Sequence, residues 1–465
     1  MRPDVLLGPV PGLDDALGVV DRFDQVLAEG LLRLGPAHAD ALTELGGAVA
    51  GSPLAAQVGE AAEKTAAGLA DENHLTALAA ARCALLGAAH DALHGVTAQA
   101  TGRATAPWTA PPGTAGPPAS PNLLAAARSW LSDIARTGWR SIDTDLVAAS
   151  RHIVAAMLAD STLRRQAVLI DGFAGELDSR CTGADPALPI PRRRWADLWS
   201  RALLLAHPAW QHTPAARTVT GRLLPLGVDL HEHATAVQAQ VHAVLEPADG
   251  SQPFLVRASV SASKPSSVVG AGCWLLLRPH LSLLSALSAG RSMTVADMPA
   301  TSEGDLLWDE AKARPGDPAD PFVTARIALP GACGMPAAPL ERHPVRLAEP
   351  VFVDGYTAVE EDGILAFSVG GYRLPVAADR IPAASPLTAR DLAASTACIG
   401  LLRWDDGGFH LQPLAVETTL KGRSTAVHAG AWAGVGTDPA AAKAETAAAK
   451  DIAVLHERAG KLLRR

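Results

Sequence analysis

The sequence predicts an α+β protein in which helical segments precede a mainly antiparallel β region and one helix follows it. Up to about residue 210, apolar residues recur every three or four positions, which is the spacing of one face of a helix. In much of the range 217–430 they alternate with polar residues, which is typical of strands with one buried face. A stretch rich in proline and glycine divides the helical part in two, so we expect several units joined by a linker.

Residues 1–103 predict a helical bundle. The first long helix covers 13–34 and ends at Gly35-Pro36, because proline cannot continue a helix. Shorter helices are predicted over 38–49 and 53–69, and another over 73–94. Arg82 borders the apolar stripe of that last helix, and we expect its charged head to reach water.

Residues 104–121 are the linker, and 122–210 form a second helical module. Proline and glycine at the density of the linker form neither a helix nor a central strand. Trp108 has no local core in this stretch, and we expect it to dock on its own protein or on a partner. The second module either stands alone or packs against the β region.

Residues 215–435 predict the β domain. Its clearest hairpin pairs 237–245 with 254–260 around a turn at 248–253. Gly370-Gly371 predicts a type I′ turn, since both of its central positions need positive φ. In the less regular middle, Leu281–Ser288 predicts a helix and Phe322–Ala328 a strand.

Residues 438–465 predict a C-terminal helix that begins after Asp438, with Pro439 in its first turn. Its small and apolar residues repeat nearly as a heptad. This stripe would pack on the rest of the chain, or on a partner helix or a second copy.

Composition and charge favour a bacterial cytoplasmic protein that binds neither nucleic acid nor membrane. The net charge is −8 and 48% of the residues are hydrophobic. The arginines at 192–194 suit an exposed helix start, or a contact for an acidic partner. Five scattered cysteines without a C-x-x-C pair argue against a disulfide framework or a zinc ribbon. The N-terminus lacks a signal-peptide pattern, and arginine and alanine are abundant as in GC-rich bacteria.

No motif predicts a nucleotide site or a nucleophilic serine. Val268–Gly272 resembles the opening of a dinucleotide-binding loop, but Leu275 stands where a third glycine is needed. We expect a buried strand there, and we predict no cofactor. The sequence contains neither G-x-x-x-x-G-K-[ST] nor G-x-S-x-G.

Two histidine pairs are candidate metal ligands. In a strand, His231 and His233 would point to one side and could hold a metal ion, with Asp229, Glu232 or His242 as a third ligand. The alternative is a polar, exposed strand end. His90 and His94 lie one helical turn apart and would either share a metal or form a partly buried, hydrogen-bonded row.

We assign no catalytic residue, and the function that we expect is a non-catalytic interaction or scaffold protein of a multi-protein system. Helical modules on a Pro-rich tether suit such a role, because tethering raises effective concentration. We expect its partners to be other proteins, and self-association through 438–465 would also fit. One alternative is a metal-dependent hydrolase using His231 and His233, and another is a small-molecule binding or sensing protein.

Overall fold

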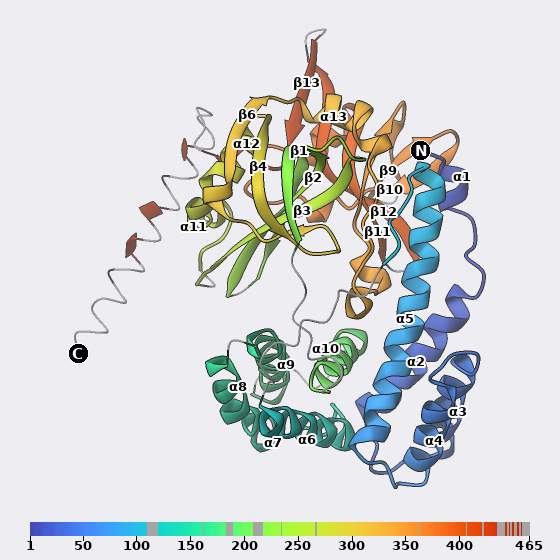
Figure 1. The fold of residues 1–465 in the computed structure, drawn as a ribbon. Coiled ribbons are helices and arrows are strands. Elements are labelled where there is room, and N and C mark those ends of the chain that lie inside the picture. Colours follow the sequence, from blue (N-terminus) through green and yellow to red (C-terminus); the bar gives the residue numbers. More distant parts are fainter. Residues whose placement is uncertain are drawn as a thin grey trace.

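A computed structural model gives the fold of the chain (Figure 1). It describes residues 1–108, 120–160, 162–182, 189–207, 217–233, 235–265, 267–361, 363–405, 407–420 and 423–434, with scattered positions up to 457. The predicted C-terminal helix over 438–465 therefore falls largely outside the described residues, as does most of the linker. Within the described part, no helix is long and apolar enough to cross a membrane.

The region from residue 3 to 205 is helical, as its periodicity predicts. Its elements are α1 Pro3–Leu6, α2 Leu13–Glu29, α3 Pro36–Ala48, α4 Ala55–Ala66, α5 Glu72–Thr101, α6 Pro121–Thr137, α7 Thr144–Ala148, α8 Ser150–Ala159, α9 Arg164–Thr182 and α10 Arg192–Leu205. Local signals explain several ends. The Asp71 carboxylate caps α5 by accepting from the backbone N–H of His74, and Gly102 ends it at φ 71°.

Both predicted helical ranges contribute to one buried core. Phe23 and Leu78, from the first range, share an apolar cluster with Trp130 and Trp199 from the second. Arg82 crosses this core with no exposed surface, so the expectation that its head reaches water is wrong. The cause is a tertiary contact, since Asp24 of α2 neutralises the guanidinium inside the core.

The β region contains a mixed sheet and two antiparallel sheets. Its strands are β1 Arg217–Glu232, β2 Ala236–Pro247, β3 Phe254–Ser263, β4 Arg291–Ala300, β5 Asp305–Leu306, β6 Ala313–Pro318, β7 Glu349–Asp354, β8 Thr357–Glu361, β9 Ile364–Val369, β10 Tyr372–Pro375, β11 Ser395–Asp405, β12 Gly408–Leu420 and β13 Arg423–His428. The mixed sheet has the order β1-β2-β3-β5-β4-β6, and β1 also pairs with β4, so the sheet closes on itself. The others are β13-β12-β11-β7 and β10-β9-β8.

Short helices lie among these strands: α11 Ala271–Leu276, α12 Leu281–Ser288, α13 Pro321–Ile327 and α14 Ala389–Ala393. In Figure 1, α11 and α12 lie beside the mixed sheet. Phe322 and Ala325 of α13 pack with Leu224 and Leu226 of β1. The apolar faces of β1, β2 and β3 join a cluster with Cys273, Trp274 and Leu277 of the α11 segment.

Several local predictions are confirmed. The β2–β3 hairpin has Val241 opposite Ala258. Gly370 and Gly371 turn between β9 and β10 at φ 57° and 85°, as a type I′ turn requires. The helix predicted over Leu281–Ser288 is α12.

Two strand predictions need correction. The segment predicted as a strand at Phe322–Ala328 is the helix α13, because Asp320 caps it and Pro321 starts it. Val268–Gly272 is not a strand: the chain turns at Gly270, at φ 57°, into α11. The region is mainly antiparallel as predicted, and the mixed sheet contains one parallel pair, β3 with β5.

Candidate functional site on one face of β1, β2 and β3

Three neighbouring strands carry a row of polar side chains on the same face. A bulge in β1 between Pro225 and Gly227 shifts its alternation. Beyond the bulge, Val228 belongs to the apolar cluster that contains Cys273, so Asp229 and His231 face the other way. We call this face, opposite Val228, the polar face; the residues that form it are Asp229, His231, Gln238, Gln240, His242, Arg257, Ser259 and Ser261.

The sheet of β11 and β12 covers one end of the polar face. A Cβ added to Gly227 would come within 2.7 Å of the Leu414 Cβ, so glycine permits the close approach of β1 to β12. Next to this crossing, Leu224 and Leu226 of β1 pack with Ile399 and Ala415. The covered end is therefore buried, and the far end of the polar face is not.

Asp229 is the centre of a buried hydrogen-bond network at the covered end. Its Oδ1 accepts from Gln412 Nε2 at 2.8 Å, and its Oδ2 accepts from an Arg403 guanidinium nitrogen at 2.5 Å. Arg403 also donates to the side-chain oxygen of Gln412. His231 Nε2 lies 3.0 Å from Asp229 Oδ2. Both carboxylate oxygens of Asp229 are thus engaged, and the side chain is held in one orientation.

Burial alone would raise the pKa of Asp229, but its partners outweigh that effect. The hydrogen bond from His231 and the positive charge of Arg403 hold the pKa of this carboxyl well below its usual range. Asp229 therefore stays ionised at neutral pH.

His242 is enclosed beside this network. It is 1% exposed, and its Nε2 has no hydrogen-bond partner among the described residues. Burial, reinforced by the charges of Arg257 and Arg403 and opposed by Asp229, lowers the pKa of His242 to about 3. This imidazole is therefore neutral at physiological pH.

The other end of the polar face is open. The His231 side chain is 49% exposed, and Gln238 and Ser261 are exposed beside it. Gln240 and Ser259 are half-buried and hydrogen-bonded to each other at 3.2 Å. The polar face therefore has a buried ion pair at its covered end and accessible hydrogen-bonding groups at its open end.

None of the three predicted third ligands is available to a metal ion between His231 and His233. Glu232 points to the opposite side of β1, where its carboxylate lies 3.3 Å from the buried Lys264 ammonium. Asp229 is occupied, and His242 is enclosed. His233 is exposed just after the end of β1. Within the described residues, no three His, Cys, Asp or Glu side chains are grouped so as to hold a metal ion.

The other predicted pair, His90 and His94, is partly buried on α5. The two rings stack with their centroids 6.0 Å apart, and His90 Nδ1 lies 3.1 Å from Asp91 Oδ1. Arg342 pairs with Asp91 and also lies over the Trp108 ring, 5.7 Å from its centroid. Trp108 therefore docks on its own protein.

The arginines at the start of α10 contact the helical region itself. Arg193 pairs with Asp21, Arg194 pairs with Glu176, and Arg192 bonds to Gln25. These contacts account for the basic run within the chain.

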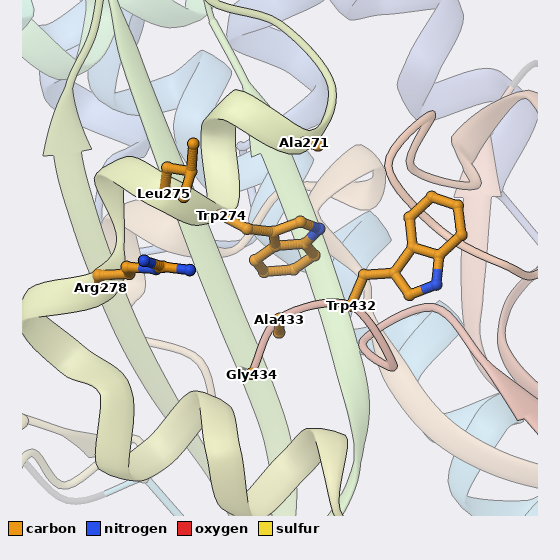
Figure 2. Close-up of a pocket in the computed structure, with 7 residues that line it drawn as sticks. All are labelled: Ala271, Trp274, Leu275, Arg278, Trp432, Ala433 and Gly434. Atoms are coloured by element: carbon orange, nitrogen blue, oxygen red, sulfur yellow. The ribbon is translucent and has the colours of Figure 1, made fainter. Parts of the chain in front are cut away.

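Two small hollows lie in the described part of the β region. One, of about 300 Å³, has Trp274, Trp432 and Arg278 in its walls (Figure 2). Trp274 is fixed there, since its Nε1 donates to the carbonyl of Ala384 at 2.8 Å. The other hollow, of about 250 Å³, lies near Gly227 and His428. These volumes include open solvent, and the enclosed space of each hollow is about 10 Å³, roughly the room that one water molecule needs, so neither is large enough for a ligand.

Arg403, Gln412 and Arg257 are site residues that the sequence did not reveal. Arg403 stands between Leu402 and Trp404 in an apolar strand, and this interruption was the available signal. Its partner Asp229 lies far away along the chain, so no local pattern links the two. Comparison with models of protein families, with curated proteins and with solved structures finds no match.

Proposed function

We propose that this protein is a non-catalytic interaction protein, or scaffold, that binds another protein through the open end of the polar face. The observation that carries the proposal is the exposed set of His231, Gln238 and Ser261 on three adjacent strands. These strands are fixed from behind by an apolar core. Hydrogen-bonding groups on such a rigid support lose little conformational freedom on binding, which favours recognition.

The attachment of the helical region supports a scaffold role. The first part of α5 contributes Leu75 and Leu78 to the helical core, and its last part contributes Leu93 and Ala100 to the core of the β region. One continuous helix therefore holds the polar face in a fixed relation to the helical surface. A scaffold needs such a relation between two binding surfaces.

Site-specific photo-crosslinking in the native host cells tests this proposal. A benzophenone amino acid replaces Gln238, and in a matched control it replaces Gln57, an exposed glutamine of α4. We expect one defined protein to crosslink at position 238 and not at 57. A further Ser261→Arg change should abolish that crosslink, because a long charged side chain would obstruct the surface. Equal crosslinking at both positions, or a crosslink that survives Ser261→Arg, would contradict the proposal.

A metal-dependent hydrolase using His231 and His233 is the second candidate. It is favoured by the hydrogen bond between Asp229 and His231, since metal-bound histidines commonly carry a carboxylate on their second ring nitrogen. Turnover of simple phosphate or carboxylate esters by the metal-supplemented protein, lost in a folded His231→Ala variant, would replace the scaffold proposal.

A further inference from the structure

We propose that His231 and His233 form an open site for a divalent transition-metal ion of the zinc type, with Asp229 as the residue that positions His231. This inference goes beyond the interaction proposal and does not depend on it. It also does not require any turnover.

Strand geometry brings the two imidazoles to one side. His231 lies in β1 and His233 follows its last residue, Glu232, so continuing the alternation of the strand by one residue places 231 and 233 on the same side. The backbone N–H of His233 donates to the carbonyl of Ala236 at 2.9 Å, so the position just after the strand is held by the β1–β2 turn. Both side chains are exposed, so an ion can reach them from solvent.

Asp229 fixes the orientation of one ligand. Its contact with His231 Nε2 at 3.0 Å directs that nitrogen inward, which leaves Nδ1 to face an ion. Arg403 already neutralises Asp229 within the protein, so His231 is not needed to balance the buried charge. The contact therefore serves to orient the ring, as the carboxylate does in carboxylate–histidine–metal arrangements.

The other neighbouring groups are excluded as ligands. The two oxygens of Asp229 accept from Gln412, Arg403 and His231. Glu232 is paired with Lys264 on the opposite side of the strand. The chain thus supplies two nitrogen ligands here, and solvent fills the remaining positions of a roughly tetrahedral ion. Imidazole ligands suit zinc, copper and nickel better than magnesium or calcium.

Zinc titration of the chelator-treated, full-length protein, followed by calorimetry, tests the site. We expect one zinc ion per chain, and loss of binding in both His231→Ala and His233→Ala. His152→Ala removes an exposed histidine of α8 and is the matched control, which should bind zinc normally. No zinc binding, or binding that is lost on changing His90 and His94 instead, would overturn the assignment.

The positioning role of Asp229 has its own readout. We expect Asp229→Asn to weaken zinc binding roughly 10- to 100-fold and to shift the visible absorption of bound Co²⁺. Circular dichroism checks that the variant is folded. Zinc affinity and a Co²⁺ spectrum equal to those of the unchanged protein would overturn the positioning role. Neither result alters the crosslinking at position 238, so failure of the metal site and failure of the interaction proposal are distinguishable.

Discussion

At the scale of single residues, buried charges determine how the helices meet. Arg82 of α5 donates to both carboxylate oxygens of Asp24 in α2, at 2.6 and 2.9 Å. It also reaches the hydroxyl of Ser200 in α10 at 3.3 Å. A single guanidinium thus joins three helices inside an apolar core, where a charge without a partner would be costly.

Breaking this pair from one side should be severe. We expect Arg82→Met to lower the free energy of unfolding by about 3–5 kcal/mol, because Asp24 would remain buried and unpaired. Adding Asp24→Leu should recover much of that loss, since it removes the second charge. Arg373→Met is the control, because its partner Glu361 is exposed and such pairs contribute at most about 1 kcal/mol. Urea unfolding measures all four proteins, and a double variant no more stable than Arg82→Met would contradict the interpretation.

His242 should make the protein sensitive to mild acid. In the folded state burial holds its pKa at about 3, whereas an imidazole in the unfolded chain has a pKa of about 6.5. Between these values the unfolded state binds more protons, so stability falls as the pH is lowered. From about pH 7.5 to about pH 5, this group alone should cost roughly 2 kcal/mol.

His242→Gln removes the titrating group and keeps a polar side chain. We expect its free energy of unfolding to fall by about 2 kcal/mol less than that of the unchanged protein over the same pH range. Urea unfolding at both pH values measures the difference. His343, whose pKa burial lowers to about 4, is present in both proteins and contributes equally. An identical pH dependence in the two proteins would show that His242 is not held neutral.

At the scale of elements, glycine at one crossing point permits two sheets to pack. Gly227 lies at the β1 bulge against Leu414 of β12, and the polar face begins next to it.

The start of the linker is held in place by contacts with the β region. The backbone N–H of Ala106 donates to the carbonyl of Gly334, and Arg342 lies over the ring of Trp108. The first residues after Arg103 are therefore held against the β region.

Gly227→Ala should force β1 and β12 apart. We expect a loss of about 1–3 kcal/mol in the free energy of unfolding, which is typical of overpacking. Leu414→Gly removes the Cβ that an alanine at position 227 would meet, so it should offset part of this loss in the double variant. It is destabilising alone, and the two changes should not be additive. Gly46→Ala in α3 is the control, because its Cβ would meet nothing within 4 Å. Additive effects of the two changes at 227 and 414 would rule out the contact.

At the scale of the whole molecule, α5 couples the helical region to the β region. It has 30 residues, which at roughly 1.5 Å per residue gives about 45 Å. Leu78 lies in the helical core and Leu93 in the core of the β region, both fully buried. Since a helix forms cooperatively, loss of either core should disturb the other.

We therefore expect one cooperative unfolding transition for the whole protein. Leu78→Ala and Leu93→Ala should each lower the free energy of unfolding by about 2–5 kcal/mol. Circular dichroism and tryptophan fluorescence should report the same urea midpoint in each variant, because tryptophans lie in both regions. Two separated transitions, with each variant shifting only one of them, would show that the regions unfold independently.

The sequence by itself determined the local elements of this protein. The helix α2, the β2–β3 hairpin and the turn at Gly370-Gly371 follow from periodicity and the need for positive φ. All three depend on residues that are close together in the sequence, so the spacing of those residues is enough to predict them. The end of α2 was predicted wrongly: it ends at Glu29 and not at Leu34, because the chain turns at Gly30 with a φ of 96°, and Gly35-Pro36 begins α3. The strand predicted at Phe322–Ala328 failed although Asp320-Pro321 marked a helix start, because a short apolar run has no clear period.

The tertiary structure decided which distant residues meet. It joined the two helical ranges in one core, buried Arg82 against Asp24, and placed Arg403 and Gln412 on Asp229. It also directed Glu232 to the other side of β1 from His231, and it enclosed His242 opposite Gly227. Such contacts depend on how whole sheets and helices pack, and the alternation of a single strand specifies its two faces without specifying what will cover them.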